Sequence, residues 1–260
     1  MLDFARSTRS LWAGKGPRKL SRWTNLCRLS LRPSQRILDF DVQYLSAYSL
    51  RILYREIFVK EEYLFPCDTE TPVIFDCGAN IGMATLYFKW LFPRSKIVGF
   101  EPDPTTFQAL RRNMEKNHLS DVSVHNVALW SGNGVVPFFV PKDQPGSLVM
   151  STNPSRNHGT QITVPSRRLS EYIDGPVDLL KVDVEGAEHQ VICDLMHSGK
   201  VEQVRRMLIE YHHNIFAEAG RLGTFLSMLE DCGLRYQISS LFSPVAQHDQ
   251  FQDVLLYAYR

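Results

Sequence analysis

The sequence VIFDCGANIG, residues 73 to 82, decides the fold class of this protein. A short apolar run ends in Asp76 and passes into a glycine-containing turn, after which a helical pattern continues as far as Pro93. A strand, a glycine turn and a helix in this order begin a βαβ unit. Gly78 and Gly82 allow a ligand to approach the backbone and allow the helix to pack on the strand. The stretch therefore predicts a parallel sheet with a ligand site at the end of its first strand.

The same alternation of apolar runs and helical patterns continues to the C-terminus. The further runs expected to form strands are residues 96–100, 122–129, 135–140, 177–184, 206–211, 234–240 and 251–259. The last two runs resemble a closing hairpin, and residues 141–160 form a long loop of the kind that is usually functional or disordered. We predict an α/β fold with a doubly wound, mostly parallel sheet, an antiparallel C-terminal strand and ligands at the carboxyl ends of the strands.

The first 70 residues do not show this alternation of strand and helix patterns. Residues 37–70 carry apolar side chains at mixed three- and four-residue steps, which predicts a helical cap or lid. Residues 1–36 contain nine Lys or Arg and one Asp, a net charge of +8 in a chain whose total is +1. We predict a basic arm over 1–36, a helical extension over 37–70 and a catalytic domain over 71–260. The arm is interpreted as a solvated leader, with substrate capture, membrane contact or an organelle transit peptide as alternatives.

Composition limits the cellular context of the protein. The balance of 29 basic and 28 acidic side chains gives no reason to expect a nucleic-acid partner. No 18-residue apolar run is present, so we expect no integral membrane segment. Five widely spaced cysteines without a C-x-x-C pair fit a reducing compartment, and we expect a cytoplasmic protein. The composition does not decide whether the chain forms a homo-oligomer.

Acidic residues at the ends of the first two strands indicate the cofactor. Asp76 places a carboxylate at the first strand tip, where it would repel a pyrophosphate but suits the ammonium and sulfonium groups of S-adenosylmethionine. Glu101 follows Gly82 by 19 residues, at the end of the next strand, where it can accept hydrogen bonds from ribose hydroxyls. Because G-x-G-x-x-G is absent, a nicotinamide-dependent oxidoreductase is the less favoured alternative. A non-catalytic binding module that retains the fold is a third hypothesis.

Several stretches of the chain form an ordered set of motifs: FDCGANIG at 75–82, GFEPDP at 99–104, NVAL at 126–129, GSL at 146–148, LKVDVEGAE at 180–188 and IEYH at 209–212. Taken in this order, they resemble the FkbM family of S-adenosylmethionine-dependent methyltransferases. Where the family commonly has Leu-Asp, this chain has Leu169-Ser170. The resemblance implies a Rossmann-like class I methyltransferase that O-methylates a hydroxyl of a small or carrier-bound sugar, polyketide or other secondary metabolite.

On these stretches we assign the cofactor-binding residues. They are expected to be Asp76, Gly78, Ala79, Asn80, Gly82, Glu101, Pro102, Asn126, Val127, Ala128 and Asp183.

Methyl transfer to a hydroxyl benefits from a general base, and candidates stand at the ends of the fourth and fifth strands. We rank Asp183 and His212 first, Glu210 as an orienting group or alternative base, and Glu185 as a candidate or a loop anchor. Lys181 and Glu188 are interpreted as structural, and His213 as facing solvent. Such a cluster could hold Mg²⁺ or another divalent ion, but the resemblance does not require one, so we assign no metal ligand.

Overall fold

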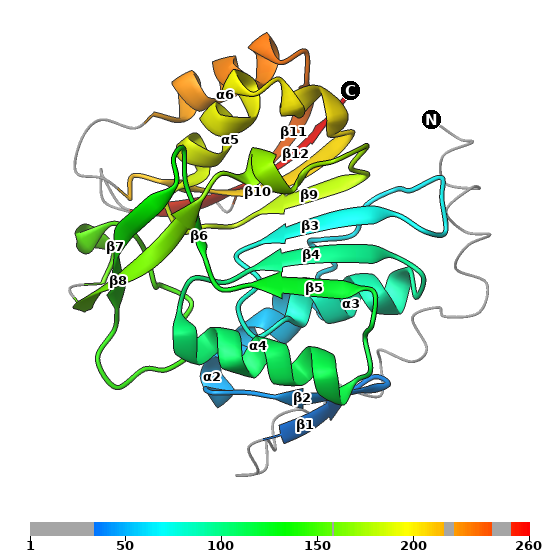
Figure 1. Ribbon diagram of the computed structural model, residues 1–260, viewed down its shortest axis with the longest axis vertical. Coiled ribbons are helices and arrows are strands. Elements are labelled where there is room, and N and C mark those ends of the chain that lie inside the picture. The colour runs from blue at the N-terminus through cyan, green and yellow to red at the C-terminus, as the bar shows by residue number, and fades with distance from the viewer. Residues whose placement is uncertain (1–33, 158, 216–220, 241–250) are drawn as a thin grey trace.

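The computed structural model describes residues 34–157, 159–215, 221–240 and 251–260, and a seven-stranded sheet lies at its centre (Figure 1). The sheet has the order β11-β12-β10-β9-β3-β4-β5. Its strands are β3 (Val73–Cys77), β4 (Lys96–Phe100), β5 (Val122–His125), β9 (Leu179–Val182), β10 (Arg206–His213), β11 (Arg235–Ser240) and β12 (Gln252–Tyr259). Only β12 runs antiparallel to its neighbours β10 and β11. The predicted fold class is therefore confirmed, including the antiparallel strand at the C-terminus.

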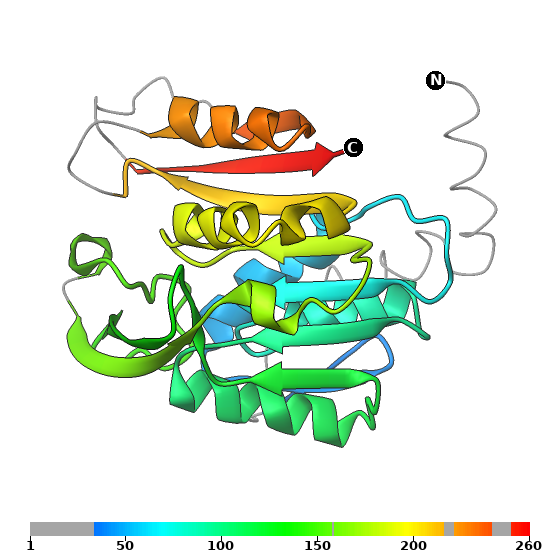
Figure 2. The same ribbon diagram turned by 45° about the horizontal axis from the view of Figure 1, so that its top comes forward.

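Helices cover both faces of this sheet (Figures 1 and 2). Alternate residues of a strand point to opposite faces, and in β3 Ile74 joins one hydrophobic core while Phe75 and Cys77 join the other. The first core includes α3 (Met83–Leu91) and α4 (Pro104–Lys116), and the second includes α5 (Glu188–His197) and α6 (Leu222–Asp231). The chain first runs outward through β3, β4 and β5, and then returns to place β9 on the other side of β3. Ligands bind at such a switch point, beyond the carboxyl ends of the strands.

The N-terminal extension is only partly helical, unlike the sequence prediction for residues 37–70. It begins with a hairpin of β1 (Ser34–Ile37) and β2 (Phe40–Gln43), followed by α2 (Ala47–Leu53) and the π-helical turn η3 (Tyr54–Val59). The backbone N–H groups of Asp41 and Gln43 donate to the side chains of Asn117 and Asn113 on α4. Because these partners lie about 70 residues away in sequence, the local apolar spacing could not indicate the hairpin.

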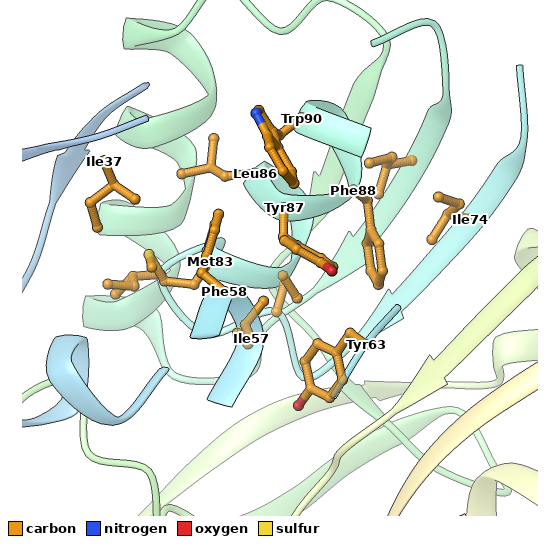
Figure 3. Close-up of a cluster of buried hydrophobic side chains, with 14 of the residues drawn as sticks. Ile37, Ile57, Phe58, Tyr63, Ile74, Met83, Leu86, Tyr87, Phe88 and Trp90 are labelled. Carbon is orange, nitrogen blue, oxygen red and sulfur yellow. The ribbon is translucent and has the colours of Figure 1, made fainter. Parts of the chain in front are cut away.

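The extension shares its core with the sheet domain. Ile37, Ile57 and Phe58 pack in one cluster with Met83 and Tyr87 of α3 (Figure 3). The rings of Phe58 and Tyr87 meet edge to face with centroids 5.1 Å apart. Of the basic arm expected over residues 1–36, only 34–36 belong to the described residues, and they form part of β1.

A second, three-stranded sheet lies beside the first and has the order β6-β8-β7. Its strands are β6 (Ala128–Leu129), β7 (Gly134–Val140) and β8 (Thr160–Arg167), and β8 was not predicted. The strand expected over residues 122–129 is in fact two strands, β5 and β6, which belong to different sheets. The chain turns at Asn126, whose side-chain amide donates to the carbonyls of Glu101 and Pro102. Short 3-10 turns complete the fold at η4 (Pro154–Arg156), η5 (Leu169–Tyr172) and η6 (Lys200–Gln203). Among the helices formed by the described residues, none has the length and apolar character needed to cross a membrane.

Candidate functional site

An open cavity of about 970 Å³, including its solvent-filled mouth, lies at the carboxyl ends of β3, β4, β9 and β10. Side chains of the N-terminal extension and of the second sheet complete its walls, among them Tyr63 and Phe138. The predicted cofactor-binding residues that line it are Gly78, Ala79, Asn80, Glu101, Pro102, Val127, Ala128 and Asp183. Residues predicted from separate stretches of sequence therefore meet at one place.

The turn after β3 has a backbone that only glycine fits at its first position. Gly78 has φ +82°, and a Cβ there would lie 1.8 Å from the carbonyl oxygen of Asp183. This close approach joins the ends of β3 and β9 beneath the cavity. Gly82, expected to bind the cofactor, does not line the cavity. A Cβ on it would lie 2.7 Å from Met114 and 2.8 Å from Leu110, so its role is to let α3 begin against α4.

Glu101 is held at the end of β4 with its carboxylate in the cavity wall. It is 4 % exposed, and its two oxygens accept hydrogen bonds from the backbone N–H groups of Asn80 (3.0 Å) and Asp103 (2.9 Å). Burial raises the pKa of Glu101 to about 8. Each oxygen keeps a lone pair for a further donor. Asn126, predicted to touch the cofactor, does not line the cavity and instead holds the backbone after Glu101 in place.

Asp76 was expected to contact the cofactor directly, and the structure does not support this. The side chain is 0 % exposed and does not line the cavity. It accepts a hydrogen bond from Thr85 of α3 (2.7 Å), and its other oxygen lies 3.3 Å from Nζ of Lys181. The helix that follows the turn packs over the strand end and encloses the carboxylate.

Lys181 is the buried cation that connects β3 and β9. Its Nζ lies 3.2 Å from Asp183 and donates to the carbonyl of Gly78 at 2.7 Å. Burial by itself lowers the pKa of Lys181, but the carboxylates of Asp183 and Asp76 raise it above its usual value, so the lysine is charged. The sequence analysis interpreted Lys181 as a structural residue only, but its side chain also lines the cavity.

Tyr63 links two carboxylates that line the cavity. Its hydroxyl lies 3.4 Å from Asp183 and 3.3 Å from Glu210, so it can donate to either one. Burial, together with the charges of Asp183 and Glu210, raises the pKa of Tyr63 well above its usual range, which keeps the proton on the hydroxyl. Sequence reasoning missed Tyr63 because it lies in the extension, where no motif marked it.

Glu210 lines the cavity from β10. Among the described residues, no Lys, Arg or His nitrogen lies within salt-bridge distance of its carboxylate. Burial and the charge of Asp183 raise the pKa of Glu210 well above its usual range.

His212, ranked with Asp183 as the first candidate for the base, does not line the cavity. Its imidazole is 1 % exposed, with Nδ1 2.7 Å from Glu188 and Nε2 3.4 Å from Glu185. Burial lowers the pKa of His212, but the carboxylates of Glu185 and Glu188 raise it well above its usual range. An enclosed imidazole of this kind cannot reach an acceptor hydroxyl in the cavity, so the ranking of His212 as base is not supported. Glu188, interpreted from sequence as structural, is the partner of His212.

Two remaining candidates differ in their surroundings. Glu185 lines the cavity and accepts a hydrogen bond from Nε of Arg156 at 2.8 Å, a partner from the long loop that the sequence did not reveal. His213 points to the opposite face of β10 from His212, toward the ring of Tyr211. The site thus has one glutamate at the end of β4 and a group of carboxylates at the ends of β9 and β10.

A family model and two related proteins to which this chain is similar are described as methyltransferases. The family model described as Methyltransferase FkbM domain matches residues 76–236. The chain is 34 % identical to Methyltransferase 1 of Beauveria bassiana over 60 % of this chain and 72 % of that protein. It is 25 % identical to 31-O-demethyl-FK506 methyltransferase FkbM of Streptomyces tacrolimicus, over 80 % of this chain and 87 % of the relative.

Among solved structures, the methyltransferase FkbM of Methylobacillus flagellatus aligns with a TM-score of 0.51 at 19 % identity. The alignment covers 79 % of this chain and 48 % of that one, so this chain spans about half of its length. At this identity the likeness concerns the fold.

Proposed function

Because the chain belongs to the FkbM methyltransferase family, we propose that it transfers the methyl group of S-adenosylmethionine to a hydroxyl oxygen. The acceptor is a small or carrier-bound sugar, polyketide or other secondary metabolite. The observation that carries the proposal is the cavity itself, which is lined by Glu101 after β4 and by the carboxylates of Asp183 and Glu210 from β9 and β10. The name of the FK506 methyltransferase relative, which specifies an O-demethyl substrate, supports oxygen as the acceptor atom.

In this proposal the cofactor lies along the turn after β3. Glu101 accepts hydrogen bonds from the two ribose hydroxyls, for which its carboxylate oxygens have lone pairs left. Val127 and Ala128 supply apolar wall beside it. Asp76 acts indirectly, because its contacts hold Lys181 and the first turn of α3 in position.

The reaction is a displacement at the methyl carbon. The acceptor oxygen forms a bond to the methyl carbon while the carbon–sulfur bond breaks, its electron pair stays on sulfur, and S-adenosylhomocysteine leaves. The hydroxyl proton passes to a carboxylate. We propose Glu210 for this role, because it lines the cavity and has no cation partner among the described residues, whereas Asp183 pairs with Lys181. Positioning of the two reactants supplies much of the rate.

The proposal extends to the setting of the protein. A cytoplasmic location and the absence of a nucleic-acid partner rest on cysteine usage and on the balanced charge. The proposed methyltransferase function is compatible with a homo-oligomer. It is also compatible with a basic segment over residues 1–36 that attracts an acidic acceptor.

The central test is a titration of the full chain with S-adenosylmethionine, S-adenosylhomocysteine and NAD(H). We expect binding of the first two and none of the third. Tight binding of NAD(H) without binding of S-adenosylmethionine would favour the oxidoreductase hypothesis. Release of S-adenosylhomocysteine in the presence of hydroxylated acceptors separates an enzyme from a binding module.

Replacing Glu101 with alanine is expected to weaken S-adenosylmethionine binding by roughly ten- to a hundredfold. Loss of hydrogen bonds to a charged group costs about 1.5 to 3 kcal/mol, which corresponds to this change in affinity. Isothermal titration calorimetry measures the effect. Glu171→Ala is the control, because this carboxylate lies at the surface and pairs with Arg168 outside the cavity. Equal affinities of the wild type and a folded Glu101→Ala variant would remove Glu101 from the ribose site.

Affinity for S-adenosylhomocysteine should also depend on pH through Glu101. Burial raises the pKa of the free carboxyl to about 8, and ribose hydroxyls donate to the ionised form, so binding lowers this pKa. Affinity is therefore constant above pH 8 and falls below it, by at most about tenfold per pH unit. The Glu101→Gln variant cannot ionise at this position. It should bind S-adenosylhomocysteine more weakly than the wild type, and its affinity should not show the fall below pH 8 that is due to Glu101. A wild-type profile parallel to that of Glu101→Gln would contradict the assignment.

A further inference from the structure

The imidazole of His212 has a buried nitrogen without a hydrogen-bond partner. Nδ1 lies 2.7 Å from Glu188, but Nε2 makes no hydrogen bond with any described residue although it is enclosed. Carboxylates stand on this side of the ring, with Glu185 at 3.4 Å, Asp183 at 3.9 Å and Asp253 at 4.0 Å from Nε2. A buried polar atom without a partner is costly and requires an explanation.

The separation of these atoms matches that of ligands around one metal ion. One oxygen each from Asp183 and Glu185 and a ring nitrogen of His212 lie within 4.8 Å of one another. Two ligands that are each about 2.1 Å from a tetrahedral ion lie roughly 3.4 Å apart. The distance from Nε2 to the Glu185 carboxylate is 3.4 Å, and the distance to Asp183 needs only a small side-chain adjustment.

Glu188 completes the arrangement from behind the ring. A histidine that binds a metal usually donates its other ring N–H to a carboxylate, which fixes the tautomer and orients the free nitrogen. The contact of Nδ1 with Glu188, which is 2 % exposed, has this form. A metal ion that binds Nε2 takes the place of a proton there, and with Nδ1 donating to Glu188 the lone pair of Nε2 is directed toward Asp183 and Glu185.

The charges around His212 are not balanced. Four carboxylates lie within 4.0 Å of its ring nitrogens: Asp183, Glu185, Glu188 and Asp253. Within the described part of the chain, Lys181 pairs with Asp183 and Arg156 with Glu185, and these are the Lys and Arg partners of the group. Because Lys181 is also shared with Asp76, these two cations do not balance the carboxylates, and a divalent cation would offset the excess negative charge.

We propose that Asp183, Glu185 and His212 form a binding site for a divalent transition-metal ion at the edge of the cavity. An imidazole ligand with two carboxylates suits Mn²⁺ or Zn²⁺, whereas Mg²⁺ and Ca²⁺ prefer oxygen ligands alone. The inference deepens the proposed function. Because Asp183 and Glu185 also line the cavity, the ion lies beside the acceptor, where it lowers the pKa of a hydroxyl that reaches it.

The test is a metal titration of the full chain without cofactor or acceptor. Protein stripped with a chelator is dialysed and titrated with Mn²⁺, and free Mn²⁺ is followed by electron paramagnetic resonance. We expect one Mn²⁺ per chain, displaced by Zn²⁺, which binds nitrogen and oxygen ligands more tightly. His212→Gln and Glu185→Gln should each weaken binding by at least the roughly 10- to 100-fold that loss of an outer-shell partner costs.

His189→Gln is the matched control. This histidine lies on α5 at hydrogen-bond distance from Tyr211 and outside the proposed ligand set, so its variant should bind Mn²⁺ like the wild type. Circular dichroism checks that the variants fold, and Glu185→Gln, whose side chain is partly exposed, remains informative if the His212 variant does not fold.

Either of two results would overturn the site. One is a wild-type chain that binds neither Mn²⁺ nor Zn²⁺, and the other is equal binding by Glu185→Gln and the wild type. Titration of the same samples with S-adenosylmethionine tests the methyltransferase proposal separately, because that measurement needs no metal.

Discussion

Replacing Glu210 with glutamine is expected to lower kcat by about 10²- to 10⁴-fold, with S-adenosylmethionine affinity near that of the wild type. The amide has nearly the shape of the carboxylate and can still accept a hydrogen bond from Tyr63, but it cannot take the proton of the acceptor hydroxyl. The loss therefore falls on the chemical step. Release of S-adenosylhomocysteine measures kcat, with whichever acceptor gives turnover in a screen of hydroxylated sugars and polyketides.

Glu56→Gln is the control for this experiment, because Glu56 is another carboxylate in the cavity wall, and its side chain makes no hydrogen bond to Tyr63 as Glu210 does. It should keep kcat within a small factor of the wild type. A folded Glu210→Gln enzyme with a normal kcat would exclude Glu210. A large loss in Asp183→Asn alone would then transfer the role to Asp183, which shares the hydroxyl of Tyr63.

Replacing Lys181 with methionine is expected to lower the free energy of unfolding by about 3 to 5 kcal/mol. Methionine fills a similar volume but removes the positive charge between Asp76 and Asp183, which lie 3.3 and 3.2 Å from Nζ. Asp76 is fully buried and would keep a charge without a counter-ion. Equilibrium unfolding in urea measures the change.

A second substitution separates lost charge pairing from altered packing. Asp76→Asn in the Lys181→Met background should recover part of the stability, because it removes the charge left buried. Lys60→Met is the control, since its ion pair with Glu62 lies at the surface, where such pairs contribute about 0 to 1 kcal/mol. A loss of less than about 1 kcal/mol in Lys181→Met would show that the buried pairing contributes little to stability.

The base and the metal proposals assign different tasks to neighbouring groups. Glu210 and His212 are two residues apart on β10, so their side chains point to the same face of the sheet. Glu210 lines the cavity, while His212 lies among the carboxylates at its edge. A loss of kcat in Glu210→Gln with unchanged Mn²⁺ binding would separate the two roles.

The fold class followed from local features of the sequence. These features are apolar runs of strand length, the glycine turn after residue 77 and the acidic residue that ends the second strand. Each of them depends only on residues within one βαβ unit. Gly78 was expected to let a ligand approach the backbone, and the structure shows that it admits the backbone of Asp183. Parallel strands bring their carboxyl ends to one edge, which is why Glu101, Asp183 and Glu210 could be expected near one another.

Only the tertiary structure decided the surroundings of each side chain. Asp76 and Glu101 both end strands, yet α3 encloses Asp76 while Glu101 faces the cavity. Tyr63 reaches Asp183 from 120 residues away, and Glu188 reaches His212 from another element. Sequence periodicity fixes the side of a strand on which a residue lies, but packing of distant elements determines whether that side meets solvent, a ligand or another charge. Protonation and metal affinity depend on those neighbours, so the sequence did not reveal them.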